Sequence, residues 1–133
     1  MAIQLAVATR NSRLNAIETE IGTTAVVKLR TGAQPANCAA ADSGTNLCTI
    51  TLPADYFNAA ASGAITKLGT WSGTGIGGGG VIAHFRMYDS GGSTCHLQGS
   101  VGQGSGDMSL DNTNIADGQV VTVTTFTLTD GNA

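Results

Sequence analysis

The sequence predicts an all-β protein: an antiparallel, jelly-roll-like β-sandwich that carries one N-terminal amphipathic helix. The first observation is the composition, since only 11% of the residues are charged while 19 of the 133 are glycine. Such a composition suits short strands joined by tight turns better than long exposed helices. The second is a series of short segments with strand-like alternation, separated by turn signals. The length fits one domain, residues 1–133, with the helix in 1–22 and the sandwich in 23–133.

Residues 3–21 carry the only helix-period pattern in the chain. Apolar side chains recur at spacings of three and four and form a stripe: Ile3, Val7, Leu14, Ile17 and Ile21. Gly22 follows where a glycine that ends a helix belongs. The opposite, polar face carries Arg10, Arg13, Asn15, Glu18 and Glu20. We expect the apolar stripe to pack on the sheet or, alternatively, against another subunit.

The first strands are predicted from alternation between apolar and polar residues. Residues 23–30 place Val27 and Leu29 inward and Lys28 and Arg30 outward. A long loop then leads to a second strand, and its inward face is formed by Cys48, Ile50 and Leu52. Pro53 ends that strand because proline cannot donate to a strand ladder. Further along, we expect Tyr56 and Phe57 to fold back onto the core, ahead of weak strands at 64–68 and 70–72.

The clearest pattern is a hairpin over residues 81–101. Two alternating runs flank the turn residues 89–93, which include two glycines that can take positive φ. The alternation predicts that Phe85 and Leu97 face the core, and that Cys95 joins them there as a small apolar side chain. Thr94 and Gln98 are predicted on the outer face of the second strand. The opposite face of the first strand carries His84, Arg86 and Tyr88.

The last third of the chain predicts short strands between glycine-rich and polar loops. A strand over 108–110 is followed by a polar turn over 111–118 and a long closing strand over 120–128. In the closing strand the apolar residues change side across Thr124 and Thr125. That change predicts a β-bulge or a strand buried on both faces.

Charge and hydropathy exclude several classes of partner. The net charge is −3, and the six basic residues form no run, so no nucleic-acid surface is predicted. No apolar segment of transmembrane length and no secretory signal is present, so we expect synthesis and folding in a cytoplasm. Three cysteines without a CxxC motif are predicted to be reduced thiols there.

Three candidate chemistries are weighed against ordinary structural roles. His84, Cys95 and His96, with Cys38 or Cys48, could be metal ligands, but neighbouring strand residues point to opposite faces. The glycine runs at 75–80 and 99–106 have no Lys-Ser/Thr and open no helix, so they predict turns rather than phosphate loops. An oxygen-rich group could bind calcium but lacks EF-hand spacing, and such residues are ordinary turn formers: Asp107, Asp111, Asn112, Asn114 and Asp117. No catalytic residue, cofactor or metal is predicted.

Several segments together resemble a family of small structural proteins of tailed bacteriophages. The resemblance covers nearly the whole chain, from ATRNSRLNAIETEIG and VVKLRTGAQPANCAAADSGTNLCTITLP to the segment that begins HFRMYDSGG. It is strongest in RTG, GxVGxGSGDMSLD and VTVTxFTLT, which are turn and strand motifs. The resemblance implies a β-rich virion protein that is assembled in the host cytoplasm and has no enzymatic activity. The closest functional analogy is a capsid cement or decoration protein.

The resulting expectation is a capsid decoration protein that binds the major capsid protein or other virion proteins and forms a homo-oligomer. A weakly charged Thr/Ser/Gly surface can dock with little desolvation. The residues assigned to partner contact are Ile3, Val7, Leu14, Ile17, Ile21, Thr94 and Gln98. The alternative is a carbohydrate-binding module of a head or tail fibre that uses loop 69–80. Trp71, the only tryptophan, is a thin stacking platform for that role.

Overall fold

The computed structural model describes residues 2–132 of the chain. Within them, one helix, α1 (Val7–Ile21), precedes a series of strands. The strands are β1 (Val26–Arg30), β2 (Asn46–Thr51), β3 (Ala64–Thr66), β4 (Ser72–Thr74), β5 (Gly80–Val81), β6 (His84–Tyr88), β7 (Cys95–Gly102), β8 (Met108–Leu110), β9 (Asn114–Ile115) and β10 (Val120–Thr129). The predicted all-β fold with one N-terminal helix is therefore confirmed at this level.

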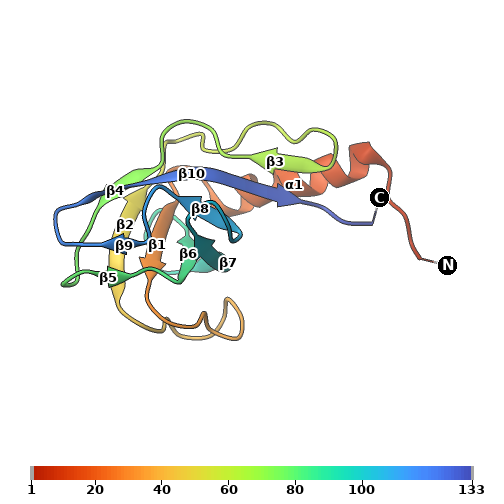
Figure 1. Ribbon diagram of the computed structural model, residues 1–133. Coiled ribbons are helices and arrows are strands. Elements are labelled where there is room, and N and C mark those ends of the chain that lie inside the picture. The colour runs from red at the N-terminus through yellow and green to blue at the C-terminus, as the bar shows by residue number, and fades with distance from the viewer. Residues whose placement is uncertain (1, 133) are drawn as a thin grey trace.

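Eight of the strands found in residues 2–132 form one curled sheet (Figure 1). Its order is β2-β1-β6-β7-β8-β10-β3, with β4 also paired to β10, while β5 and β9 form a separate two-stranded sheet. The β7–β8 pair is parallel and the other named pairs are antiparallel, so the sheet is mixed. The predicted division into the two sheets of a sandwich or jelly roll is not confirmed.

The curl brings β2 next to the segment that follows β4. Cys48 forms a bridge with Gly75, and the Ile76 amide donates to the Leu47 carbonyl at 2.8 Å. The approach is close: a Cβ added to Gly73 would lie 2.8 Å from Cys48 Sγ. Glycine is therefore required at position 73 for the sheet to close around its core.

The core is built on a cluster of aromatic rings. Phe126 on β10 stacks on Phe57 with ring centroids 6.0 Å apart and meets the edge of Phe85 at 5.4 Å. Trp71 lies 5.6 Å from Phe126 and is fully buried. Tyr56 and Phe57 fold back onto this cluster, so that prediction is confirmed.

The helix begins at Val7 and not at residue 3, so the predicted start is wrong by about one turn. Ala6, the residue before it, has extended backbone (φ −60°, ψ 150°) and provides no side-chain cap. The end is confirmed: Gly22 has φ 90°, and its amide donates to the Glu18 carbonyl at 2.9 Å. Leu14 and Ile21 pack into the core, whereas Ile3 lies outside the helix.

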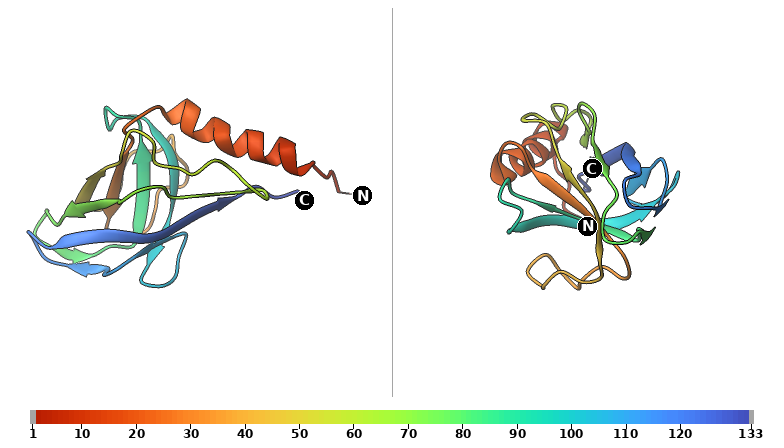
Figure 2. Two further views of the ribbon diagram at one scale, coloured as in Figure 1. Left: turned by 90° about the horizontal axis from the view of Figure 1, so that it is seen from above. Right: turned by 90° about the vertical axis from the view of Figure 1, so that its left-hand side faces the viewer.

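Arg10 corrects the predicted polar face of the helix. It was assigned to the exposed side, but it is only 8% exposed. Its guanidinium lies against Gly63, where a Cβ would come within 2.2 Å of Nη1, and Nη1 donates to the Asp130 carbonyl at 3.3 Å. The helix therefore turns Arg10 toward the loop before β3 and toward the end of β10. Figure 2 shows that the end of β10 approaches the N-terminal end of the helix.

The central hairpin is confirmed, but it is shorter than predicted. β6 and β7 are antiparallel, and the Asp89 carboxylate accepts from the amide of Ser93 at 3.2 Å in the turn. Val81, expected in the first hairpin strand, belongs to β5 and pairs with Asn114 on β9. β6 itself is buried on both faces, because residues of the loop between β1 and β2 cover the face that the alternation assigns to the outside.

A bulge in this hairpin overturns the predicted position of Cys95. The register shifts so that Leu97 pairs with Met87 while Cys95 pairs with Tyr88. Cys95 therefore leaves the core face, and its sulfur accepts from Arg86 Nε at 3.2 Å. The placement of Cys95 beside Leu97 in the core was wrong because strict alternation does not hold across a bulge.

The predicted bulge in the closing strand is confirmed. The register between β10 and β8 shifts between Val123 and Thr125, where the apolar residues change side. Val123 and Phe126 are buried on either side of the shift.

Among the described residues, none of the helices is long and apolar enough to cross a membrane.

Candidate functional site

The most densely bonded polar site surrounds the buried guanidinium of Arg86 on β6. Its side chain is 1% exposed. Nε donates to Cys95 Sγ, and Nη1 donates to the Ala40 carbonyl at 3.0 Å and to Asp42 Oδ1 at 2.7 Å. Nη2 donates to the Cys38 carbonyl at 2.8 Å. Each nitrogen of the guanidinium thus has an acceptor, as a buried cation requires.

Asp42 provides the negative charge of this site. Burial alone raises the pKa of its carboxyl, but the hydrogen bond from the Tyr88 hydroxyl and the cations Arg30, Arg86 and Lys28 outweigh burial and hold that pKa below its usual value. The same contact raises the pKa of Tyr88, for which burial is the largest cause. Asp42 is therefore ionised and Tyr88 neutral at neutral pH.

This arrangement fastens the loop between β1 and β2 over β6. Two further contacts do the same: Gln98 Nε2 donates to the Pro35 carbonyl at 2.7 Å, and His84 Nδ1 lies 2.8 Å from the Gly32 carbonyl. Since the Arg86 donors are already engaged, the guanidinium has none left for an anionic ligand. The site therefore orders a long loop over the hairpin.

We expect acid to weaken this site through Asp42. A carboxyl whose pKa is depressed on folding stabilises the protein above its unfolded-state pKa, and this contribution is lost as the pH falls through the folded-state pKa. The Asp42→Asn variant should therefore be less stable than the parent at pH 7, and the difference should shrink below about pH 4. Urea unfolding of both proteins between pH 7 and pH 2.5 measures this. A difference that is independent of pH would contradict it.

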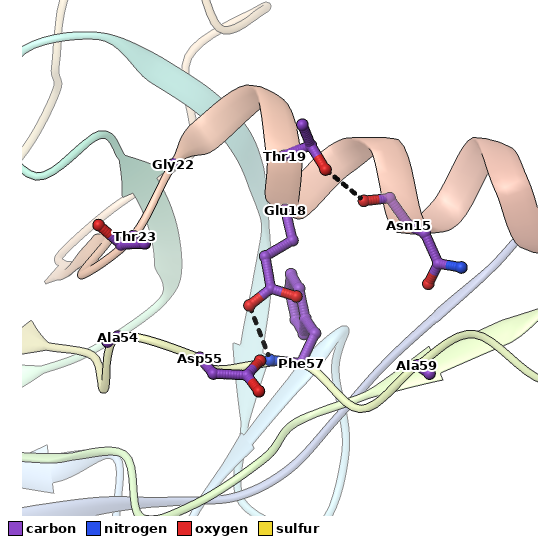
Figure 3. A pocket seen from close by; sticks show the side chains of 9 residues that line it. All are labelled: Asn15, Glu18, Thr19, Gly22, Thr23, Ala54, Asp55, Phe57 and Ala59. Carbon is purple, nitrogen blue, oxygen red and sulfur yellow. Dashed lines mark hydrogen bonds between the residues drawn. The ribbon is translucent and has the colours of Figure 1, made fainter.

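A second candidate site is a hollow of about 580 Å³ between the end of α1 and residues 54–59 (Figure 3). Glu18 points from the helix across this space, and its Oε1 accepts from the amides of Tyr56 at 3.0 Å and Phe57 at 3.4 Å. Asn15 Oδ1 similarly accepts from the Ala60 amide at 2.8 Å. The predicted exposed role of Glu18 is therefore corrected: its carboxylate attaches the loop to the helix.

The chemistry of this hollow is limited by those contacts. Its lining contains the carboxylates of Glu18 and Asp55 but no basic or nucleophilic thiol side chain. Burial and the Glu18 charge raise the pKa of the nearby Tyr56 hydroxyl to about 12, and that hydroxyl donates to the Gly22 carbonyl at 2.8 Å. The Tyr56 hydroxyl is neutral at neutral pH and already donates a hydrogen bond, so the hollow is a packing boundary between the helix and the loop.

Two of the residues weighed as metal ligands are occupied by other contacts. His84 is buried beside Gly32, and Cys48 lies in the core. Within residues 2–132, no group of three or more His, Cys, Asp or Glu side chains is arranged to hold a metal ion. The acidic turn residues accept hydrogen bonds from backbone amides in separate places. Asp107 accepts from the Ser100 amide, Asp111 accepts from the Thr122 amide, and Asp117 accepts from the Gly78 amide.

The residues assigned to partner contact have different environments. Ile3 is 78% exposed and Val7 48% exposed, whereas Leu14 and Ile21 are buried and Ile17 is partly buried. The two from the hairpin also differ: Thr94 is exposed, and Gln98 is half-buried. The alternation did not reveal three further exposed apolar side chains, Ile76, Val81 and Val120.

Comparison of the chain with models of protein families, with curated proteins and with solved structures finds no match in any of the three. The inference of function therefore starts from the residues and contacts described above.

Proposed function

We propose that this protein is a non-enzymatic structural component of a tailed-bacteriophage virion, a capsid-associated cement or decoration protein. In this role it binds the major capsid protein or other virion proteins and forms a homo-oligomer. The proposal includes the finer fold expected for such proteins, in which the curled sheet acts as a jelly-roll-like platform. The observation that carries it is the exposed apolar surface at the N-terminal arm, residues 2–6, and the first turn of α1.

The N-terminal arm offers apolar surface on an anchored backbone. The Leu5 amide donates to the Asn132 carbonyl at 2.7 Å, so the arm is joined to the end of the chain. Both termini lie at the same end of the molecule (Figures 1 and 2). Ile3 nevertheless leaves 78% of its surface in water. Full burial of an isoleucine side chain is worth about 1.5–3 kcal/mol, which makes this arm a favourable contact for a partner.

A second group of exposed apolar residues supports contacts with more than one neighbour. Val120 is 62% exposed at the start of β10, and Val81 is 58% exposed on β5. These strand ends lie at the opposite end of the molecule from the two termini (Figure 1). A protein that contacts neighbours at both ends can bind an assembled lattice durably even when each contact is weak.

The polar sites also support a binding role rather than catalysis. The Arg86 guanidinium donates hydrogen bonds to the Asp42 carboxylate and to a carbonyl of the loop between β1 and β2. Glu18 is used by loop amides. These side chains hold the fold in shape, which leaves surface contact as the function that the geometry favours.

The carbohydrate-binding alternative receives no support from the aromatic residues. Sugar-binding surfaces present aromatic rings, and each tryptophan, tyrosine and phenylalanine of this chain is buried. Trp71, the stacking platform considered in loop 69–80, is 0% exposed and donates from Nε1 to the Leu68 carbonyl at 3.1 Å. We therefore favour protein partners.

We expect the double substitution Ile3→Asp and Val7→Asp to weaken binding to phage particles that lack this protein by at least about 10-fold. Charged groups placed in an apolar contact lose hydration without gaining a partner. The measurement is co-sedimentation of purified protein with such particles. Both residues are exposed, so the melting temperature should change little.

Ala16→Asp is the matched control, because Ala16 is exposed on α1 and lies away from the arm. It should bind as the parent does. Equal loss of binding in both variants would assign the effect to charge in general, and unchanged binding of the double variant would contradict the role of the arm. Failure of the parent to bind any particle would contradict the proposed function itself.

A further inference from the structure

Two cysteines that are distant in the sequence meet beside Arg86. Cys38 lies on the loop between β1 and β2, and Cys95 begins β7. Arg86 Nη2 donates to the Cys38 carbonyl at 2.8 Å, while Arg86 Nε donates to Cys95 Sγ at 3.2 Å. Both cysteines line the same cavity of about 300 Å³, and burial together with the neighbouring Cys38 thiol raises the pKa of the Cys95 thiol. Both are free thiols in the structure.

We infer that Cys38 and Cys95 form an oxidation site, in which a small-molecule disulfide such as oxidised glutathione converts the thiol pair into an intramolecular disulfide. This inference goes beyond the proposed function and does not depend on it. It also goes beyond the expectation of reduced thiols in a cytoplasm, which rested on the number and spacing of the cysteines and could not show that two of them line one cavity.

The reaction is two successive thiol–disulfide exchanges. The Cys38 thiolate attacks one sulfur of the glutathione disulfide, whose S–S bond breaks and releases one glutathione thiolate. Cys95 Sγ then attacks the Cys38 sulfur of the mixed disulfide and releases the second glutathione thiolate. The protons of the two cysteines pass to the released thiolates through solvent, and two electrons pass from the protein to the reagent.

Arg86 favours the second exchange. Burial is the largest influence on the pKa of the Cys95 thiol and raises it, and the neighbouring guanidinium opposes that rise. The positive charge 3.2 Å from Cys95 Sγ stabilises the thiolate form of Cys95, which is the form that attacks the mixed disulfide. The loop carrying Cys38 is held in place by the same guanidinium, so both cysteines line one cavity before oxidation.

The surroundings favour oxidation over metal binding. The site is positively charged by Arg86 and Arg30, and Lys28 Nζ lies 4.6 Å from the centre of the Tyr88 ring. The one carboxylate present, Asp42, is already paired with both arginines. A divalent cation would meet this positive charge with only two thiols to bind it.

Cys48 is the internal comparison. It is 0% exposed in the core, and burial raises the pKa of its thiol to about 11. Its sulfur is packed against the backbone of Gly73. A thiol that is neither ionised nor accessible does not exchange.

The test is incubation of the folded protein with oxidised glutathione, followed by intact mass analysis under denaturing conditions. We expect a loss of two hydrogens, about 2 Da, for each chain. Cleavage after Lys and Arg leaves Cys38 and Cys48 on one peptide, 31–67, and Cys95 on 87–133. The Cys48→Ala variant therefore provides the assignment: it should show the same mass loss and a cross-link between these two peptides.

A second measurement is thermal unfolding. The disulfide closes a long loop, so it should raise the melting temperature by roughly 10 °C, and a reductant should reverse the rise. Cys38→Ser and Cys95→Ser should each abolish both the mass loss and the rise in melting temperature, while retaining the near-UV circular dichroism of a folded protein. A stable mixed disulfide without ring closure, a cross-link through Cys48, or a cross-link between chains would overturn the inference.

Discussion

Replacement of Arg86 by methionine is expected to lower the free energy of unfolding by about 3–5 kcal/mol. Methionine fills a similar volume but leaves the carbonyls of Cys38 and Ala40 without donors, and leaves Asp42 without its closest cation. These acceptors are part-buried, so they lose their donor without regaining full hydration. Equilibrium urea unfolding of the variant and the parent measures the difference, and proteolysis of the loop between β1 and β2 should also become faster.

Two comparisons separate this effect from a general loss of charge. Arg86→Lys keeps the charge but lacks the planar group that reaches several acceptors, so we expect an intermediate loss. Arg13→Met removes a side chain that is 55% exposed and pairs with Asp130 at 3.2 Å. The Asp130 side chain is only 7% exposed, so the loss should exceed the roughly 0–1 kcal/mol of a fully exposed pair but stay well below that of Arg86→Met, because Arg13 itself is largely in water while Arg86 is 1% exposed. Equal losses in the Arg86→Met and Arg13→Met variants would mean that Arg86 does not hold the loop.

Phe85→Ala is the second substitution with a large expected effect, a loss of about 3–5 kcal/mol in the free energy of unfolding. Phe85 is 2% exposed, meets Phe126 edge-on, and lies against Gly99, where an added Cβ would be 2.8 Å from its ring. Removal of the ring leaves a cavity that this tightly packed hairpin cannot fill. Thermal and urea unfolding provide the measurement.

Thr94→Ala is the matched control for Phe85→Ala, because Thr94 lies exposed at the end of the same hairpin turn. Its loss should be below about 1 kcal/mol. Gln98 does not serve as a second control, since its amide donates to the Pro35 carbonyl under the covering loop. Equal destabilisation by Phe85→Ala and Thr94→Ala would contradict the assignment of the core face of β6.

The candidate site was only partly predictable. The sequence indicated a hairpin with Arg86 and Tyr88 on one face, and it indicated a long loop that contains Cys38 and Asp42. It contained no signal that this loop folds over that face. The charged and thiol side chains come together only because β1 lies between β2 and β6, which brings the loop leaving β1 back across the hairpin.

What the sequence by itself determined are the features that depend on near neighbours in the chain. The cap at Gly22, the hairpin turn after Tyr88 and the bulge of β10 at Thr124 all follow from local conformational preference and from residue periodicity. Only the tertiary structure decided that Arg10 is buried, that Cys95 lies off the core face, and that the sheet closes between Cys48 and Gly75. Each of these depends on which distant segment lies opposite, and periodicity contains no information about that choice.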